Sequence, residues 1–330
     1  MSDIRIGIIS VAHLHAFTYA SILCEMPGVR FVGLFDEEES RGQACAAQYG
    51  VALYSECADL LSEVDGVVIC SENRLHFPYA KQAAEAGVHI LVEKPITTDG
   101  NEARELIGLC EQKQVWLQTA FPVRMNTSVH QVKRRLDQGD IGQVLAITAT
   151  NHSKMPGGWF VDPERSGGGA VLDHTVHVLD ILRWMLKSEV KSVYAEIGTL
   201  LHDIPSDDCG LLSLTFENGI VATLDTSWSR PASFPIWSDV TLRIIGTKGV
   251  LHLDMHGQVG HVWENGAALT HRQVPWGDSA NQALIGEFVD SIRVSRPPLI
   301  SGEDGLRAAE VAWAAYRSAQ EKRPVAVQHY

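Results

Sequence analysis

Short apolar runs alternate with amphipathic stretches along the first third of the chain. A short run bounded by turn residues is typical of a strand buried on both faces, and apolar residues repeating every three to four positions are typical of a helix. The runs predict strands at residues 4–10, 29–35, 66–70, 88–92 and 115–120, and the stretches predict helices at 15–26, 40–49, 78–86 and 98–113. This alternation predicts an α/β domain with a doubly wound parallel sheet.

The rest of the chain has a different pattern, because apolar and polar residues alternate within its strand-like stretches. These stretches are residues 144–152, 190–200, 210–216, 220–228, 240–245 and 250–253, and helices are predicted at 127–138, 170–186, 286–294 and 306–321. Turn signals at 217–219 and 246–249 connect strands as in a meander-like antiparallel sheet. We expect helices on one face of this sheet and a partner on the other. Two domains are therefore predicted, residues 1–121 and 122–330.

Composition limits the possible partners and compartments. Hydrophobic residues make up 45% of the 330 residues and charged residues 20%, an ordinary balance for a globular protein. The formal net charge of -13, with no basic stripe, argues against a nucleic-acid partner. Six cysteines are scattered without a CxxC pair, as expected in a reducing compartment. With no membrane-length apolar run and no basic leader, we expect a cytoplasmic protein.

The turn after the first predicted strand is where a dinucleotide-binding fold places its phosphate loop, G-x-G-x-x-G. Residues 10–15 read S-V-A-H-L-H, so all three glycines are replaced. Ser10 and Ala12 are small enough for a diphosphate to approach, whereas a bulky histidine at the third position predicts a shifted loop. We expect backbone N–H groups near Ala12, His13 and Leu14 to bind the diphosphate at the helix N-terminus.

Asp36 ends the second predicted strand and opens an acidic run at residues 36–39. In a dinucleotide-binding fold, a carboxylate at this point accepts hydrogen bonds from ribose hydroxyls and repels a 2′-phosphate. The alternative is that Asp36 caps the helix near Ser40. Arg41 could face a 2′-phosphate, but its surroundings are strongly acidic. The expected cofactor is NAD in preference to NADP.

Polar side chains gather where the third and fourth predicted strands end. Residues 87–95 read G-V-H-I-L-V-E-K-P, so Glu93 and Lys94 follow a buried run and Pro95 forces a turn. Glu93 and Lys94 are expected to contact the cofactor. A lysine at this ligand-binding edge also suits a catalytic ammonium, and a solvated turn is the alternative. Four more polar residues are expected to contact a cofactor, or else to cap the next helix: Ser71, Glu72, Asn73 and His76.

Residues 167–169 form a glycine run before the predicted helix 170–186. On that helix Asp173, His177 and Asp180 lie at i, i+4 and i+7 and therefore share one face. A carboxylate one turn from an imidazole can orient it and stabilise its protonated form, as in an acid–base pair. The alternative is structural, with Asp173 favoured by the helix dipole and His177 satisfied in a core. Asp180 is expected to be structural.

Several motifs along the chain belong to one pattern. They are N-R-L-H at 73–76, A-A-E-A-G-V-H at 83–89, E-K-P at 93–95, W-F-V-D-P at 159–163 and S-G-G-G at 166–169, followed by Asp173 and His177. This set resembles the Gfo/Idh/MocA oxidoreductases, the glucose-fructose oxidoreductase and inositol dehydrogenase type of enzyme. The resemblance covers nearly the whole chain and departs from the family in the glycine loop. It implies an N-terminal Rossmann domain followed by a domain with a large open, mainly antiparallel sheet.

The resemblance also implies an activity, NAD(P)-dependent hydride transfer to or from a secondary alcohol of a sugar, cyclitol or related polyol. His177 would take the hydroxyl proton, Asp173 would orient His177, and Lys94 would hydrogen-bond the reacting oxygen. Two alternatives stay open. One is a nicotinamide-using lyase or hydrolase with transient oxidation. The other is a non-catalytic nucleotide-binding protein, because the glycines are lost.

Further residues are expected near the substrate because of their position: Arg124, His152, Trp159 and His174. Several histidines could converge on a metal ion, and this is an alternative to the expectation that no metal is bound. The remaining expected partner is a second copy of the chain. A homodimer or homotetramer would use the open face of the second sheet.

Overall fold

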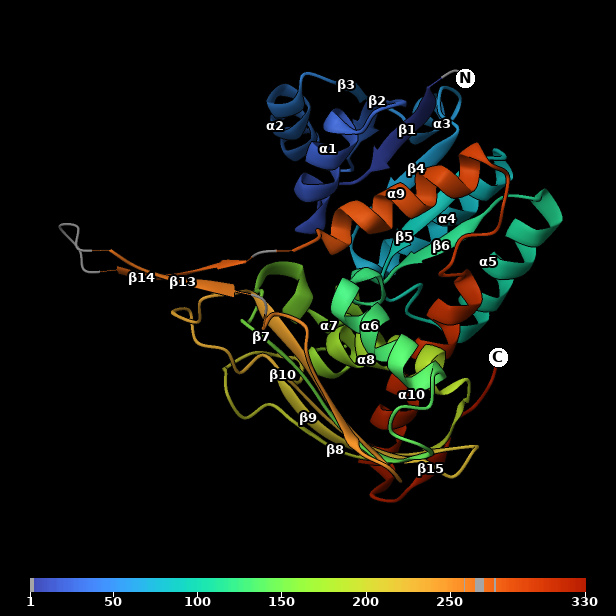
Figure 1. Ribbon diagram of the computed structural model, residues 1–330. Coiled ribbons are helices and arrows are strands. Elements are labelled where there is room, and N and C mark those ends of the chain that lie inside the picture. The colour runs from blue at the N-terminus through green and yellow to red at the C-terminus, as the bar shows by residue number, and fades with distance from the viewer. Residues whose placement is uncertain (1–2, 258, 265–269, 276) are drawn as a thin grey trace.

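The computed structural model describes residues 3–257, 259–264, 270–275 and 277–330, which fold around two large sheets (Figure 1). The first sheet is parallel and six-stranded, in the order β3-β2-β1-β4-β5-β6. Its strands are β1 (Ile4–Ile9), β2 (Val29–Phe35), β3 (Ala52–Tyr54), β4 (Gly66–Ile69), β5 (His89–Glu93) and β6 (Leu117–Ala120). This order is that of a Rossmann domain, so the predicted doubly wound sheet is confirmed.

Successive strand residues of the first sheet pack into different cores, which is why these strands are apolar throughout. Ile8 and Leu91 are fully buried in the core on the side of α1 (His15–Glu25) and α9 (Ala280–Arg293). Val67 and Val92 are fully buried in the core on the side of α4 (His76–Glu85) and α5 (Gly100–Lys113). The helices of this half are α1 (His15–Glu25), α2 (Glu39–Tyr49), α3 (Cys57–Leu61), α4 (His76–Glu85) and α5 (Gly100–Lys113).

The second sheet is seven-stranded, in the order β12-β11-β7-β10-β9-β8-β15. Its strands are β7 (Val144–Ser153), β8 (Val190–Gly198), β9 (Cys209–Phe216), β10 (Val221–Ser227), β11 (Ser238–Gly246), β12 (Val250–Asp254) and β15 (Val325–Ala326). The mainly antiparallel character is confirmed. The expected meander is wrong at one place, because β10 pairs with β7 in parallel and the chain must cross over to reach β11.

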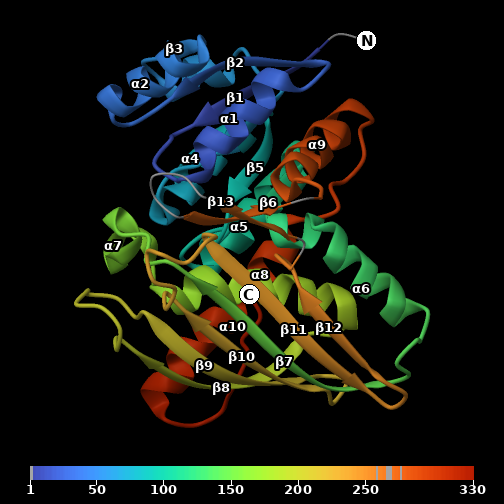
Figure 2. The same cartoon turned by 60° about the vertical axis from the view of Figure 1, so that its left-hand side comes forward.

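In the part of the chain that the structure describes, helices cover only the inner face of the second sheet, between it and the Rossmann domain (Figure 2). The helices in the second half of the chain are α6 (Thr127–Asp137), α7 (Pro163–Ser166), α8 (Ala170–Leu186), α9 (Ala280–Arg293) and α10 (Gly302–Glu321). Strand residues such as Ala149, Leu212 and Leu224 point inward and are buried against α8 and α10. In the described ranges, none of the helices combines the length and apolar character that a membrane crossing requires.

Several elements differ from the prediction. The short β3, α3, α7 and β15 were not predicted, because so few residues give no clear periodicity. β13 (Val259–Glu264) and β14 (Thr270–Pro275) were also missed and form a hairpin that projects away from both domains (Figure 1). α9 begins at Ala280, earlier than expected, and packs against α1 and β1 of the first domain. The C-terminal segment therefore returns to the Rossmann domain.

Candidate active site

Helix α8 carries three of the predicted site residues, and groups distant in the sequence hold its N-terminus. The Asp207 carboxylate accepts hydrogen bonds from the backbone N–H groups of Gly169 (3.0 Å) and Val171 (2.8 Å) and from the Tyr316 hydroxyl (2.8 Å). A Cβ atom at Gly169 would overlap the backbone of Asp207, and one at Gly168 would overlap the Tyr316 hydroxyl. The glycine run is therefore a place of close approach that fixes where α8 begins.

Asp173 lies in the first turn of α8 and faces the Rossmann domain. Its Oδ1 accepts a hydrogen bond from the Lys94 ammonium, and its Oδ2 accepts one from the buried Trp228 indole at 3.2 Å. Burial alone would raise the pKa of Asp173, but the Lys94 ammonium holds it well below its usual range. Asp173 is therefore a carboxylate that joins Lys94 of the first domain to helix α8 of the second.

His177 lies one turn further along α8 and is half-buried. Its Nδ1 atom is buried and has no hydrogen-bond partner among the described residues, and the Phe121 ring stands edge-on to it at 6.0 Å. Burial, with the nearby Lys94 ammonium, lowers the pKa of His177 well below its usual value. The imidazole is therefore neutral. Asp173 was expected to orient His177, but its carboxylate accepts hydrogen bonds from Lys94 and Trp228 instead.

Lys94 follows the last residue of β5, and its side chain is only 5% exposed. The neighbouring Glu93 carboxylate is fully buried and accepts hydrogen bonds at Oε1 from His15 and Tyr19, both at 2.8 Å. His13 stands close to its second oxygen, with 3.9 Å between His13 Nε2 and Glu93 Oε2. His13, His15 and Glu93 thus gather their ligand-type atoms within 4.8 Å of one another, at the turn that replaces the glycine loop.

The turn at residues 10–14 has one residue in a conformation that glycine favours, although it contains no glycine. Ser10 adopts φ +62°, the left-handed region where glycine is favoured, and its hydroxyl donates to Glu37 at 3.0 Å. The N–H of Ala12 donates to Ser10 Oγ at 3.3 Å, and that of His13 donates to the Cys70 carbonyl at 2.9 Å. Two of the three N–H groups expected to bind a diphosphate are therefore engaged within the protein.

Asp36 is less accessible than expected for a ribose ligand, because its side chain is fully buried. Its carboxylate accepts hydrogen bonds at 2.7 Å from the N–H groups of Val11 and Glu38 and is paired with the Arg41 guanidinium. The same guanidinium donates to Glu37, whose side chain is 27% exposed. Asp36 thus ties the turn after β1 to the end of β2, and Glu37 is the carboxylate on the outside.

The polar residues after β4 join the two domains or pack inside the first, and none of the predicted side-chain caps forms at the helices they open. Glu72 pairs with Arg165, and the Asn73 amide donates to the Ser166 carbonyl at 2.8 Å. His76 is fully buried, with Nδ1 2.7 Å from the carbonyl oxygen of Pro95 and Nε2 3.3 Å from that of Ser71. They therefore fix the turn around Lys94.

Two of the residues expected near the substrate lie elsewhere. Arg124 is buried in an ion pair with Asp180, and its guanidinium also contacts Asp304, so it holds α10 against α8. His152 is paired with Asp225 and Asp239. His152 points to the outer face of the second sheet, because adjacent strand residues alternate and its neighbour Ser153 bonds to His174 on α8.

His174 and Trp159, by contrast, lie beside the central groups. His174 is buried, with its Nδ1 3.6 Å from Asp173 Oδ2 and its Nε2 2.9 Å from Ser153 Oγ. The Trp159 indole donates to the carbonyl of Ala12 at 3.1 Å, so it contacts the turn at residues 10–14 directly. Trp228, Asp207 and Tyr316 were missed by sequence reasoning. Only the consecutive aspartates at 207–208 gave any signal, since their carboxylates suit helix capping.

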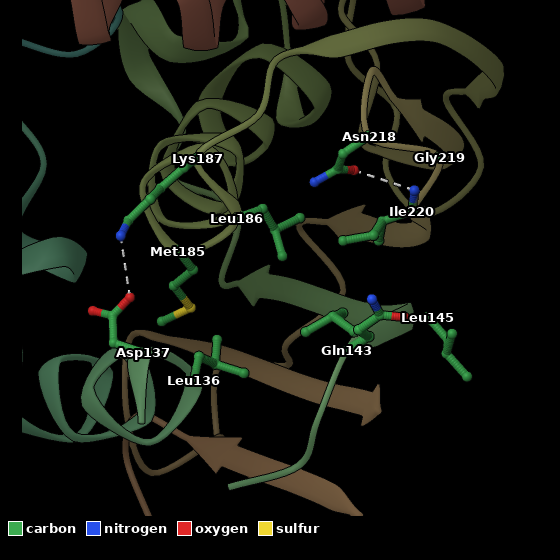
Figure 3. Close-up of a pocket in the computed structure, with 11 residues that line it drawn as sticks. Leu136, Asp137, Gln143, Leu145, Met185, Leu186, Lys187, Asn218, Gly219 and Ile220 are labelled. Carbon is green, nitrogen blue, oxygen red and sulfur yellow. Dashed lines mark hydrogen bonds and ion pairs between the residues drawn. The ribbon is translucent and has the colours of Figure 1, made fainter. Parts of the chain in front are cut away.

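A hollow of about 480 Å³ opens at the other end of α8, between that helix, α6 and the β9–β10 turn (Figure 3). Its floor is apolar, with Leu136, Met185 and Ile220, and a Lys187–Asp137 ion pair stands at its rim. Since Met185 follows Asp173 by more than three helical turns, about 18 Å of helix separates the hollow from the Lys94–Asp173 pair. The hollow is therefore distinct from the candidate active site.

The fold is a Rossmann domain joined to a mixed-sheet second domain, and both parts match models of one class of protein, NAD-binding oxidoreductases. Residues 4–121 match the family described as "Oxidoreductase family, NAD-binding Rossmann fold", and residues 129–252 match the "GFO/IDH/MocA C-terminal domain". The chain belongs to the Gfo/Idh/MocA family of oxidoreductases.

Relatives cover almost the whole chain. It is 28% identical over 321 residues to "Uncharacterized oxidoreductase YrbE" of Bacillus subtilis, covering 93% of this chain and 92% of that protein. It is 26% identical over 347 residues to "Myo-inositol 2-dehydrogenase" of Thermotoga maritima, covering 98% of each. Among solved structures, GenD2 from gentamicin A biosynthesis in complex with NAD has a similar fold, with a TM-score of 0.91 at 24% identity over 99% of this chain and 97% of GenD2.

Proposed function

We propose that this chain is an NAD-dependent dehydrogenase that transfers a hydride between nicotinamide and a secondary alcohol of a sugar, cyclitol or related polyol. The observation that carries the proposal is the Lys94–Asp173 contact between the domains, with the neutral, half-buried imidazole of His177 one turn away. The family matches favour this oxidoreductase over the lyase, hydrolase and purely nucleotide-binding alternatives.

Each of the three side chains has a form that suits one task. His177 is neutral and only half-buried, so a ring nitrogen of its imidazole can accept the hydroxyl proton. An ammonium has three N–H donors, so Lys94 can bond to Asp173 and still donate to the reacting oxygen. Asp173 fixes the position of Lys94 rather than the orientation of His177. The bound nicotinamide supplies the hydride acceptor, and these residues hold the alcohol and its proton.

The charge balance of the site favours a neutral substrate. The positive charge of Lys94 is offset by Asp173, and burial lowers the pKa of His174 to about 4, so that His174 is neutral. A site without surplus positive charge does not attract a carboxylate or phosphate. Polar donors and acceptors that are neutral overall match the hydroxyl groups of a polyol. Relatives include a myo-inositol 2-dehydrogenase and a D-apiose dehydrogenase, which supports this substrate class.

A substrate screen tests the proposal. The purified chain is incubated with NAD and a panel of cyclitols, aldoses and glycosides, and the absorbance of reduced cofactor is followed. We expect reduction of NAD with at least one polyol. Product elimination without net reduction of NAD would support the lyase alternative. Tight NAD binding without turnover on any polyol would support the non-catalytic alternative.

We further propose that NAD is preferred to NADP. The cofactor edge of β2 carries Asp36 and Glu37, and both accept from Arg41, a cation at that edge that could pair with a 2′-phosphate. A 2′-phosphate would have to displace two carboxylates from that guanidinium. NAD requires no such exchange.

We also propose a homo-oligomer, dimer or tetramer, in the cytoplasm. The outer face of the second sheet is bare of helices and presents exposed Leu211, Val221 and Val250. A second copy of that face would cover these apolar residues, as in symmetric dimers. Free cysteines at six positions fit a reducing compartment. Light scattering and cell fractionation test these two statements.

A further inference from the structure

The turn after β1 offers few backbone donors to a ligand, yet it holds a side-chain donor that lacks a partner. The N–H groups of Val11, Ala12 and His13 are engaged with Asp36, Ser10 and Cys70, respectively. In a glycine loop, such N–H groups face the dinucleotide. The imidazole of His13 stands in the same turn, with its side chain 4% exposed. His13 is therefore the candidate ligand-binding group in a turn that has lost its glycines.

The position of the His13 proton follows from one hydrogen bond. The backbone N–H of His15, at the start of α1, donates to His13 Nδ1 at 3.2 Å. A ring nitrogen that accepts an N–H carries a lone pair, so in the neutral imidazole the proton lies on Nε2. Burial, opposed by Glu93, lowers the pKa of His13 to about 3, so the ring is neutral at physiological pH. His13 therefore presents Nε2–H as a donor.

This donor has no acceptor among the described residues. The nearest carboxylate oxygen, Glu93 Oε2, is 3.9 Å away, which is too far for a hydrogen bond. A buried donor without a partner is destabilising, so its retention calls for an explanation. A metal ion is not the answer, because a protonated Nε2 has no lone pair to ligate it. A ligand oxygen is.

The surroundings indicate what kind of oxygen fits. The Glu93 carboxylate beside Nε2 would repel a phosphate, so a neutral acceptor is favoured. On its other side the His13 ring packs near Phe160 (5.3 Å between ring centroids) and Trp159 (6.1 Å), which belong to the second domain. Since Glu93 precedes Lys94, the donor lies beside the proposed reaction centre, not at the adenosine end of the cofactor site.

We propose that His13 is a binding residue whose Nε2–H donates to a neutral oxygen of the bound reactants, either the carboxamide oxygen of nicotinamide or a hydroxyl of the polyol. The proposal rests on the proposed dehydrogenase function for the identity of those reactants. In this proposal the altered turn binds a ligand through a side chain in place of backbone N–H groups. His15 N–H fixes the His13 tautomer, and the ring passes that donor on to the ligand.

Two variants separate the donor from the bulk of the ring. His13→Phe keeps an aromatic ring without a donor, and His13→Gln restores an N–H near the Nε2 position. Calorimetry measures binding of NAD and of ADP-ribose, which lacks nicotinamide, and steady-state kinetics measures the KM of a polyol identified in the screen. The expected loss in His13→Phe is roughly 3- to 10-fold, the net worth of one neutral hydrogen bond.

The two sources of the oxygen give different results. If the acceptor is the carboxamide, His13→Phe weakens NAD but not ADP-ribose, and His13→Gln recovers most of the loss. If it is a polyol hydroxyl, NAD binding is unchanged and the KM of the polyol rises. Unchanged values in all three measurements would overturn the proposal, as would an equal loss of ADP-ribose binding. A chain that turns over no polyol but shows the NAD-specific loss would refute the dehydrogenase function and leave the His13 assignment standing.

Discussion

At the scale of single residues, the position of a residue along the chain predicted which side chains lie at the site, but it did not predict their hydrogen-bond and ion-pair partners. Lys94, Asp173 and His174 come together as expected, whereas Arg124 is consumed by a buried pair with Asp180. Arg124 follows the last Rossmann strand, and that place is compatible with either role. Only the distance to Asp180 decides between them, and no sequence pattern gives that distance.

Replacing the catalytic groups should separate chemistry from folding. His177→Asn removes the proton acceptor and should lower turnover by at least about 100-fold with little change in the thermal midpoint. Lys94→Ala should lower turnover similarly and also destabilise the protein by about 3–5 kcal/mol, because the buried Asp173 loses its cation. Turnover per folded molecule and thermal unfolding are measured together. A folded His177→Asn variant with near wild-type turnover would falsify the assignment.

Cofactor choice should respond to Glu37. Glu37→Gln removes one of the carboxylates that hold Arg41 and one negative charge from the cofactor edge. NADP affinity relative to NAD should therefore rise by up to about fivefold, the size of one exposed ion pair. Glu39→Gln is the matched control, because Glu39 accepts a hydrogen bond from Gln43 on the surface of α2. Calorimetric titration of both cofactors gives the ratio, and an equal rise in the control would contradict the role of Glu37.

At the scale of elements, α8 depends on a close approach that its own sequence does not display. Its apolar face and length are readable, and its predicted range is confirmed. The groups that satisfy its first N–H donors come from Asp207, before β9, and Tyr316, on α10. The glycine run signals that something approaches closely, but not what approaches.

A pair of glycine substitutions tests this point. Gly169→Ala places a methyl group against the backbone of Asp207 and should destabilise the protein by about 1–3 kcal/mol, as overpacking does, while lowering turnover. Gly108→Ala lies in the interior of α5 with open space at its Cβ and should instead stabilise by about 0.5–1 kcal/mol. Chemical denaturation gives both values. Equal tolerance of the two changes would show that the start of α8 is not closely packed.

At the scale of the whole molecule, buried histidines set the pH dependence of stability. Burial lowers the pKa of His13 to about 3 and those of His76 and His174 to about 4. The unfolded chain, with histidine pKa values of about 6.5, binds more protons between about pH 4 and 6.5, so stability rises with pH there. Asp180 acts in the opposite sense, because burial raises its pKa to about 6, but the histidines whose pKa burial lowers, His177 among them, outweigh it.

Above pH 6.5 the trend should reverse. Although burial opposes it, pairing with Asp225 and Asp239 raises the pKa of His152 to about 9. The stability contributed by His152 is therefore complete below about pH 6.5 and is lost as pH rises through 9. We expect the thermal midpoint to peak near pH 6.5, and His152→Gln to remove the alkaline decline. A midpoint that keeps rising to pH 9.5 in the wild-type chain would contradict this balance.

The assembly proposal is tested at the same scale. Leu211→Lys places a cation opposite Asp225 on the outer face, where the sheet itself tolerates it. A charge buried between two copies should shift the chain from oligomer to monomer in light scattering at micromolar concentration. Val294→Lys, an equally exposed site after α9, is the control and should leave the mass unchanged. Identical masses for Leu211→Lys and wild type would exclude this face as the interface.

The sequence by itself determined the two-part α/β and α+β architecture, because strand and helix periodicities are local and the strands are buried in recognisable ways. It also determined the sheet edge where Lys94 lies and the family, since both depend on short contiguous motifs. The tertiary structure alone decided the parallel β7–β10 pairing, the partners of Asp173 and the unpartnered Nε2–H of His13. These depend on atoms brought together across long separations, and periodicity carries no information about such distances.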